Sequence, residues 1–148
     1  MAENLVAQAT VQIAASAEDV WSVLVDPHAR WMVGARVTST YVVGDPITFD
    51  GEWEGKPFQD HGEIVEVERP RLLRYTHYSP LSGQPDVPEN YHHLTFTLEE
   101  SDGSTTVTLE QDGNGSTDEV EHAEGLWRRV LEALAASVVP DAHPADRT

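Results

Sequence analysis

Cysteine is absent from this chain of 148 residues. The absence excludes a disulfide framework, a thiol nucleophile and a thiolate metal site, and it fits a reducing compartment. The segment MAENLVAQ at the start has no basic region followed by an apolar stretch, so no secretory signal is predicted. No apolar run approaches the roughly 18 residues that a membrane helix needs. We therefore expect a cytoplasmic protein with no segment inserted in a membrane.

Basic residues are also scarce. The chain has 9 Lys and Arg against 26 Asp and Glu, a formal net charge of −17. A surface this acidic repels phosphate backbones, so nucleic acid is not an expected partner. The chain has no G-x-S-x-G motif, no glycine-rich phosphate loop and no evident pair of catalytic carboxylates. No cofactor and no metal site are predicted, and motifs alone assign no catalytic residue.

Alternation of apolar and polar residues predicts seven strands, at residues 6–15, 35–43, 47–53, 58–68, 73–77, 90–99 and 105–112. Mostly short connections join the last six, which predicts an antiparallel meander. Ser16 and Asp19 resemble a capping box before a short helix over residues 17–25, and a second helical turn is predicted through residues 28–31. Residues 79–89 hold three prolines and a glycine, and are predicted to be a long loop.

A long amphipathic helix is predicted over residues 117–139. Its apolar residues recur at three- and four-residue steps and share one face: Val120, Ala123, Trp127, Val130, Leu131, Leu134 and Val138. Only a sheet offers enough surface to bury that face, and a seven-stranded sheet curls because strands twist. The predicted fold is α+β of the helix-grip type: a curved antiparallel sheet wrapped around the long C-terminal helix, with two short helices after the first strand.

The domain organisation predicted from these elements is simple. Residues 1–139 form a single helix-grip domain, and residues 140–148 form a disordered tail, because Pro140 and Pro144 disfavour a continued helix.

Several segments carry a resemblance to a known superfamily. They are VQIAASAEDVWSVLVDP (residues 11–27), VGDPITFDGEWEGK (43–56), GEIVEVERPRLLRYTH (62–77), SPLSGQPDVPENYHHLTF (79–96), VTLEQDGN (107–114) and EHAEGLWRRVLEAL (121–134). With the order of the elements, they resemble the START-related, pollen-allergen-like and polyketide-cyclase superfamily of helix-grip proteins. The branch they resemble is named for homologues of the activator of the heat-shock-protein ATPase.

The resemblance implies an apolar cavity between the long helix and the sheet. Members of the superfamily bind lipids or hormones or act as cyclases or dehydratases, and founders of the branch stimulate a chaperone ATPase. A hydrophobic small molecule or a lipid is therefore the expected ligand. An enzyme with a histidine in the cavity, and a regulator with a chaperone as its partner, are the alternatives.

The expected lining of this cavity follows from the strand alternation and the helix face. The candidates are Trp31, Phe49, Trp53, Tyr75, His77, His92, Phe96, Trp127 and Leu131. The same aromatic rings would serve equally well as ordinary core.

His61, His77 and His92 are the polar candidates on predicted strands, with His77 or His92 as an acid or base. His92 and His93 are adjacent and must point to opposite faces. Gln111 shares the phase of the apolar residues before it, and is either a polar group in the cavity or a strand-end residue. The loop at residues 79–89 is either a preformed gate or a rigid cover of the sheet end.

Overall fold

The structure is a computed structural model that describes residues 5–26, 28–29, 31–32, 35–80, 83–114 and 116–139. The side chain of Trp53 is outside this description, as is the predicted tail at residues 140–148. The predicted second helical turn at residues 28–31 includes Arg30, which also lies outside the described residues.

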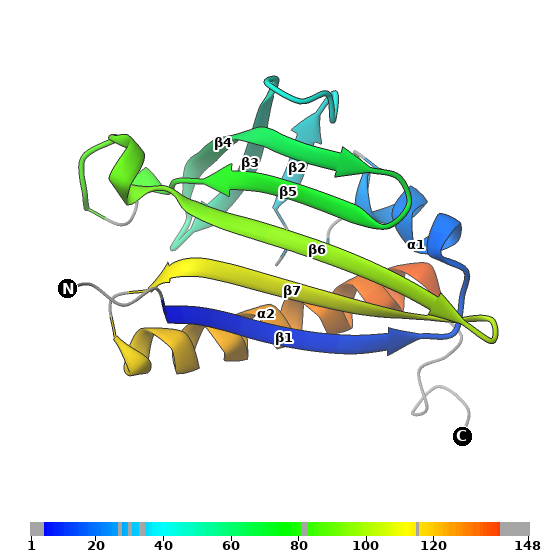
Figure 1. Ribbon diagram of the computed structural model, residues 1–148. Helices are drawn as coiled ribbons and strands as arrows, with labels where there is room; N and C mark the ends of the chain where they lie inside the picture. The colour runs from blue at the N-terminus through cyan, green and yellow to red at the C-terminus, as the bar shows by residue number, and fades with distance from the viewer. Residues whose placement is uncertain are drawn as a thin grey trace.

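Seven antiparallel strands form one sheet, as the alternation predicted (Figure 1). They are β1 (Leu5–Ile13), β2 (Arg36–Ser39), β3 (Pro46–Trp53), β4 (Lys56–Glu68), β5 (Leu72–His77), β6 (His92–Ser101) and β7 (Ser104–Asn114). Their order across the sheet is β1-β7-β6-β5-β4-β3-β2. The last six strands are therefore a meander, and β1 closes the far edge by pairing with β7.

One tight turn of the meander explains how β6 pairs with β7. Asp102 and Gly103 join β6 to β7 with φ of 55° and 81°. Positive φ at both central residues is the geometry of the two-residue hairpin turn that matches strand twist, and glycine adopts it without steric cost. The turn sets the register, in which Leu98 pairs with Val107 and Phe96 with Leu109.

Helix α1 (Ala17–Leu24) follows β1 directly. Its first turn is capped by Ser16, whose hydroxyl accepts a hydrogen bond of 3.1 Å from the backbone N–H of Asp19. The helix buries Val20, Trp21 and Leu24. The predicted cap of this helix is therefore present.

Helix α2 (Thr117–Val138) is the long helix predicted from the apolar stripe. It buries Ala123, Trp127, Val130, Leu131 and Leu134, and packs on β1, β7 and α1. In Figure 1, α2 runs behind β7 and β1, while β3 and β2 lie behind β4 and β5, so the sheet curls toward the side of the helix. Helix α2 rests mainly on β1 and β7, and pockets lie between its N-terminal half and β3–β5.

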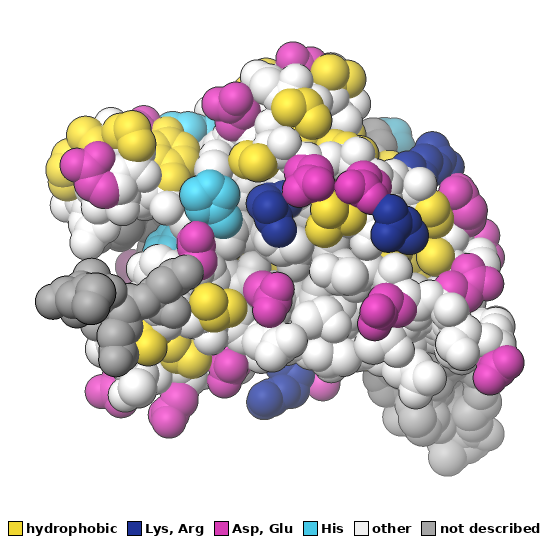
Figure 2. All heavy atoms as spheres, viewed as in Figure 1, with side chains coloured by type: hydrophobic (Ala, Val, Ile, Leu, Met, Phe, Trp, Pro, Cys, Tyr) yellow, Lys and Arg dark blue, Asp and Glu magenta, His cyan; other side chains and the backbone are white. Residues whose placement is uncertain are grey.

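The outer face of the sheet carries the acidic surface expected from composition. Carboxylates are spread over the strands, the turns and the loop in Figure 2. Arginines on this face pair with some of them: Arg74 with Glu66 at 3.3 Å, and Arg69 with Glu18 at 3.0 Å. Within the described ranges, no helix is long and apolar enough to cross a membrane.

Candidate functional site

Two adjoining pockets lie between α2 and the curved sheet. The first, here the strand pocket, has a volume of about 650 Å³ and is lined by Met32, Ala35, Phe49, Asp50, Gly51, Glu52, Pro57, Phe58, Asp60, His77, Leu126 and Trp127. The second, here the loop pocket, has a volume of about 450 Å³ and is lined by His77, Ser79, Gln84, Asn90, His92, Gln111, Asn114, Asp118, Glu119, His122, Ala123, Leu126 and Trp127. His77, Leu126 and Trp127 border both.

Trp127 borders both pockets and makes a polar contact with the sheet. Its indole N–H donates a hydrogen bond of 2.6 Å to Oε1 of Gln111 on β7. Both residues are nearly buried, with 5% and 9% of their surface exposed. Because the indole can only donate, the oxygen of the amide must face Trp127, and the NH₂ group takes the other direction. Gln111 also borders the loop pocket.

His77 lies between the two pockets and contacts a carboxylate. Its Nε2 is 3.0 Å from Oδ2 of Asp60, and the side chains of the two residues are 18% and 14% exposed. Phe49 packs edge-on against the imidazole, with ring centroids 5.1 Å apart. An ionised carboxylate only accepts hydrogen bonds, so the Nε2–H group donates, and Nδ1 carries the lone pair of the neutral ring. The second oxygen of Asp60, Oδ1, is buried without a partner among the described residues.

His92 is the direct neighbour of His77 across the β5–β6 pair. Its Nδ1–H donates a hydrogen bond of 2.8 Å to the backbone carbonyl of Asp112, which leaves Nε2 as the basic nitrogen. The ring lies against Gly113, where an added Cβ would come within 3.0 Å of Nδ1. Two imidazoles on adjacent strands therefore border the loop pocket, each with its tautomer set by the acceptor behind it.

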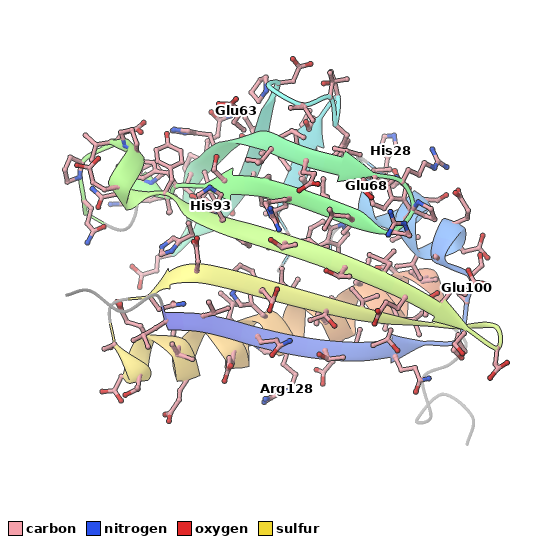
Figure 3. The ribbon with its side chains drawn as sticks, viewed as in Figure 1. His28, Glu63, Glu68, His93, Glu100 and Arg128 are labelled. Carbon is pink, nitrogen blue, oxygen red and sulfur yellow. The ribbon has the colours of Figure 1, made fainter. Side chains whose placement is uncertain are left out.

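His61 lies elsewhere, on the outer face of the sheet. Its Nε2 is 3.1 Å from Oδ2 of Asp86 and 2.9 Å from the hydroxyl of Tyr91. The two partners bond each other at 2.6 Å. His93 and Glu63 also stand on this face in Figure 3, and with the other three they border an outer pocket of about 490 Å³. The cluster joins the loop at residues 83–91 to β4. His61 therefore does not converge with His77 and His92.

The structure divides the nine predicted cavity residues into groups. Phe49, His77, His92 and Trp127 border one or both pockets. Trp31, Tyr75, Phe96 and Leu131 are buried in the core and are not part of either lining. The side chain of Trp53 is outside the description.

Packing among the rings explains why part of the set belongs to the core. Trp31 meets Phe96 edge-on at 5.5 Å, and Tyr75 stacks on Phe96 at 6.2 Å. The hydroxyl of Tyr75 has no partner among the described residues, and burial raises its pKa well above 10.0, so it stays neutral. These residues are buried beneath other side chains and border neither pocket.

The lining of the pockets also includes residues outside the nine predicted ones, among them Asp60, Met32, Phe58 and Leu126. Asp60 shares strand parity with Phe58, Gly62 and buried Ile64, so alternation along β4 contained a signal for its inward direction. Leu126 is half-buried at the edge of the helical stripe. Within the described ranges, no three His, Asp or Glu side chains converge in a way that could hold a metal ion.

Solved structures of other proteins have the same fold as this chain. ChR145 from Cytophaga hutchinsonii, a solution structure, is 38% identical, with a TM-score of 0.82 over 96% of this chain and 99% of that one. CV1439 from Chromobacterium violaceum is 22% identical, with a TM-score of 0.73 over 90% and 96%. The pollen-allergen-like protein Ara h 8.0201 is 13% identical, with a TM-score of 0.72 over 93% and 99%. Among curated proteins, no sequence matches.

These structures share the helix-grip fold that the predicted superfamily implies. The narrower branch is shown by a family model, described as activator of Hsp90 ATPase homolog 1-like protein, which matches residues 14–138. That span runs from the end of β1 to the end of α2 and includes both pockets. The chain therefore belongs to the family of activator of Hsp90 ATPase homolog 1-like proteins.

Proposed function

We propose that this protein binds a hydrophobic small molecule or a lipid between α2 and the sheet. The observation that carries the proposal is the junction of the strand pocket and the loop pocket at His77, Leu126 and Trp127. Each pocket has a volume within the range of about 300–1,000 Å³ that is typical of small-molecule sites. The absence of cysteine supports a reducing, cytoplasmic setting for this binding.

Apolar walls supply the driving force in this proposal. Met32, Phe49 and Phe58 form the wall on the sheet side of the strand pocket, and Leu126 and Trp127 form the wall on the helix side. Burial of apolar ligand surface contributes about 25 cal/mol per Å² before the cost of association is subtracted. The loop supplies Gln84 and Asn90 to the loop pocket, so a ligand entering there passes the predicted gate.

A pair of tryptophan substitutions on α2 tests the proposal. Leu126→Trp adds volume at the junction of the pockets, whereas Arg129→Trp adds the same side chain on the exposed face of the helix. The probe is N-phenyl-1-naphthylamine, a neutral apolar fluorophore, followed by its emission and by the chemical shifts of residues in both pockets. We expect Leu126→Trp to weaken binding at least about tenfold by steric exclusion, and Arg129→Trp to leave it unchanged. Equal binding by both variants, or no shifts in the pockets of the unsubstituted protein, would contradict the proposal.

The family name motivates the chaperone alternative, since it refers to activation of an Hsp90 ATPase. That function predicts faster ATP turnover when the protein is mixed with an Hsp90-class chaperone. Turnover that rises with this protein and falls back with Leu126→Trp would connect the two functions. Unchanged turnover would remove the chaperone alternative and leave ligand binding standing.

A further inference from the structure

Three residues that border the loop pocket each have a side-chain polar atom with no hydrogen-bond partner among the described residues. Within the described part of the chain, the buried side-chain nitrogen and oxygen atoms that lack a hydrogen bond are Asp60 Oδ1 and Tyr75 Oη. The hydrogen bonds of His77, His92 and Gln111 use Nε2, Nδ1 and Oε1, respectively, and leave one polar atom of each side chain unbonded among the described residues. His77 Nδ1, His92 Nε2 and Gln111 Nε2 are consequently not buried, and all three residues border the loop pocket.

These atoms differ in what they can do. In its neutral form, His77 presents a lone pair at Nδ1, because its Nε2–H is committed to Asp60 at 3.0 Å. A carboxylate behind an imidazole orients the ring and stabilises the imidazolium that forms when the ring takes a proton. Gln111 presents an N–H donor, since its oxygen is committed to Trp127. A base and a hydrogen-bond donor thus border one pocket.

We propose that His77 is a general base that removes a proton from the carbon next to the carbonyl of a neutral, apolar substrate. Asp60 is its positioning residue, and the Gln111 amide donates to the oxygen on which negative charge develops. The assignment rests on the proposed function, because the substrate must occupy the same pockets as the ligand.

The proposed reaction conserves protons and electrons within the substrate and His77. The lone pair of Nδ1 takes the proton, the C–H electron pair becomes the new carbon–carbon π bond, and the carbonyl π electrons move to oxygen, forming an enolate. Return of the proton from the imidazolium to a different atom of the same molecule completes an isomerisation. No oxidant, reductant or second substrate is needed.

The charge of the lining selects a neutral substrate. Carboxylates border both pockets, with Asp50, Glu52 and Asp60 in one and Asp118 and Glu119 in the other. None of the residues described as lining either pocket is a lysine or an arginine. An anionic substrate would meet repulsion with no cation to offset it, and no lysine is present there to form an imine.

The test uses 5-nitrobenzisoxazole, a neutral aromatic carbon acid. When a base takes its C–H proton, the N–O bond breaks and a coloured nitrophenolate forms, so proton abstraction is read directly by absorbance. We expect the protein to open the ring about 100-fold faster than the same concentration of free imidazole. His77→Gly removes that acceleration, and added imidazole restores part of it. His93→Ala, on the opposite face of β6, leaves the rate unchanged.

Asp60→Asn tests the positioning role, because asparagine keeps an oxygen that can accept from Nε2–H but carries no charge. We expect kcat to fall about tenfold or more while KM stays the same, since the substrate contacts are kept. A purely structural role would change KM as well, or lower both through misfolding. Binding of the probe is measured separately by the chemical shifts of pocket residues. Binding with no acceleration, or acceleration that survives His77→Gly, overturns the assignment and leaves ligand binding intact. Absence of binding by this probe and by N-phenyl-1-naphthylamine overturns both proposals.

Discussion

The indole nitrogen of Trp127 lies 2.6 Å from Oε1 of Gln111, and this bond joins α2 to β7 at the wall shared by the two pockets. The donor is on a helix and the acceptor on a strand, 16 residues apart in sequence. The bond fixes the indole against the cavity and fixes the direction of the amide. It therefore contributes to both the shape and the polarity of the site.

Removal of either partner should cost stability. Trp127→Phe leaves the amide oxygen without its donor, and Gln111→Leu leaves the indole N–H without its acceptor. We expect each single change to lower the free energy of unfolding by about 1–3 kcal/mol, the cost of an unsatisfied buried polar group. The double variant should lose less than the sum of the two, because it leaves neither group unpaired. Urea denaturation of the four proteins measures the coupling, and strict additivity would show that the bond contributes nothing.

Gly62 on β4 should tolerate no side chain. An added Cβ there would lie 1.7 Å from the backbone carbonyl oxygen of Thr76, an atom that cannot move without displacing β5. We expect Gly62→Ala to lower the free energy of unfolding by about 2 kcal/mol or more and to separate Asp60 from His77. Gly125→Ala in α2 is the matched control, because nothing lies within 4 Å of its added Cβ.

The control Gly125→Ala should raise the free energy of unfolding, whereas Gly62→Ala lowers it. Alanine in a helix interior is favoured over glycine by about 0.5–1 kcal/mol, so Gly125→Ala should raise the unfolding midpoint in urea. A loss of stability at both positions would mean that the two glycines are constrained alike, contrary to the structure.

The sequence predicted most strands and both helices well because each has a strong period and clear turn chemistry. The exception is β2, which was predicted over residues 35–43 but ends at Ser39, before Tyr41 with its positive φ of 59°. Val107 and Leu109 alternate with polar residues along β7, and the stripe that contains Trp127 repeats along α2. A period of two assigns each residue to a face of the sheet. His77 and His92 both border the loop pocket. The alternation does not predict how deeply a side chain is buried. Phe96 and Phe49 have the same inward direction and are both buried, yet Phe96 packs against Trp31 whereas Phe49 belongs to the lining of the strand pocket.

The partner of His77 was harder to predict than its direction. Asp60 reaches the imidazole through the pairing of β4 with β5, whose register shifts between Ile64 and Glu66. Such an irregularity changes which residues meet across the pair, and the order of strands in the chain does not contain it. Contacts between side chains from different strands depend on register, which a single sequence specifies only weakly here.

His61 should hold the loop at residues 83–91 against the sheet. Its Nε2–H lies within hydrogen-bonding distance of both Asp86 and the Tyr91 hydroxyl, so His61→Ala removes the centre of a three-residue cluster. We expect backbone amides in the loop to exchange with deuterium about tenfold faster, because the loss of such bonds lowers the cost of local opening. His93→Ala removes a neighbouring imidazole of the outer pocket without breaking the cluster, and should leave loop exchange as it is. Equal protection in all three proteins would show that the cluster does not hold the loop.

Besides the buried Tyr75, two tyrosines should ionise late, and for different reasons. Burial raises the pKa of Tyr41 to about 12, whereas the hydrogen bond to Asp86 is the main cause that raises the pKa of Tyr91 to about 12. Unfolded tyrosine ionises near pH 10, so between about pH 10 and 12 the folded protein holds protons that the unfolded chain has released. The stability that these residues contribute is therefore complete below about pH 10 and is lost as the pH rises toward 12.

A titration of Asp86→Ala separates the effect of burial on the pKa of Tyr41 from the effect of the Asp86 hydrogen bond on the pKa of Tyr91. Without the carboxylate, the pKa of Tyr91 should fall toward 10, while that of Tyr41 should remain about 12 because its burial is unchanged. The phenolate absorbance of Asp86→Ala, compared with that of Tyr91→Phe and Tyr41→Phe, assigns each step. Urea unfolding at intervals from pH 9 to 12 should show the decline in stability beginning near pH 10 in the unsubstituted protein, with a smaller decline in Asp86→Ala. A late step that disappears with Tyr41→Phe but does not respond to Tyr91→Phe would show that the Asp86 bond does not control the ionisation of Tyr91.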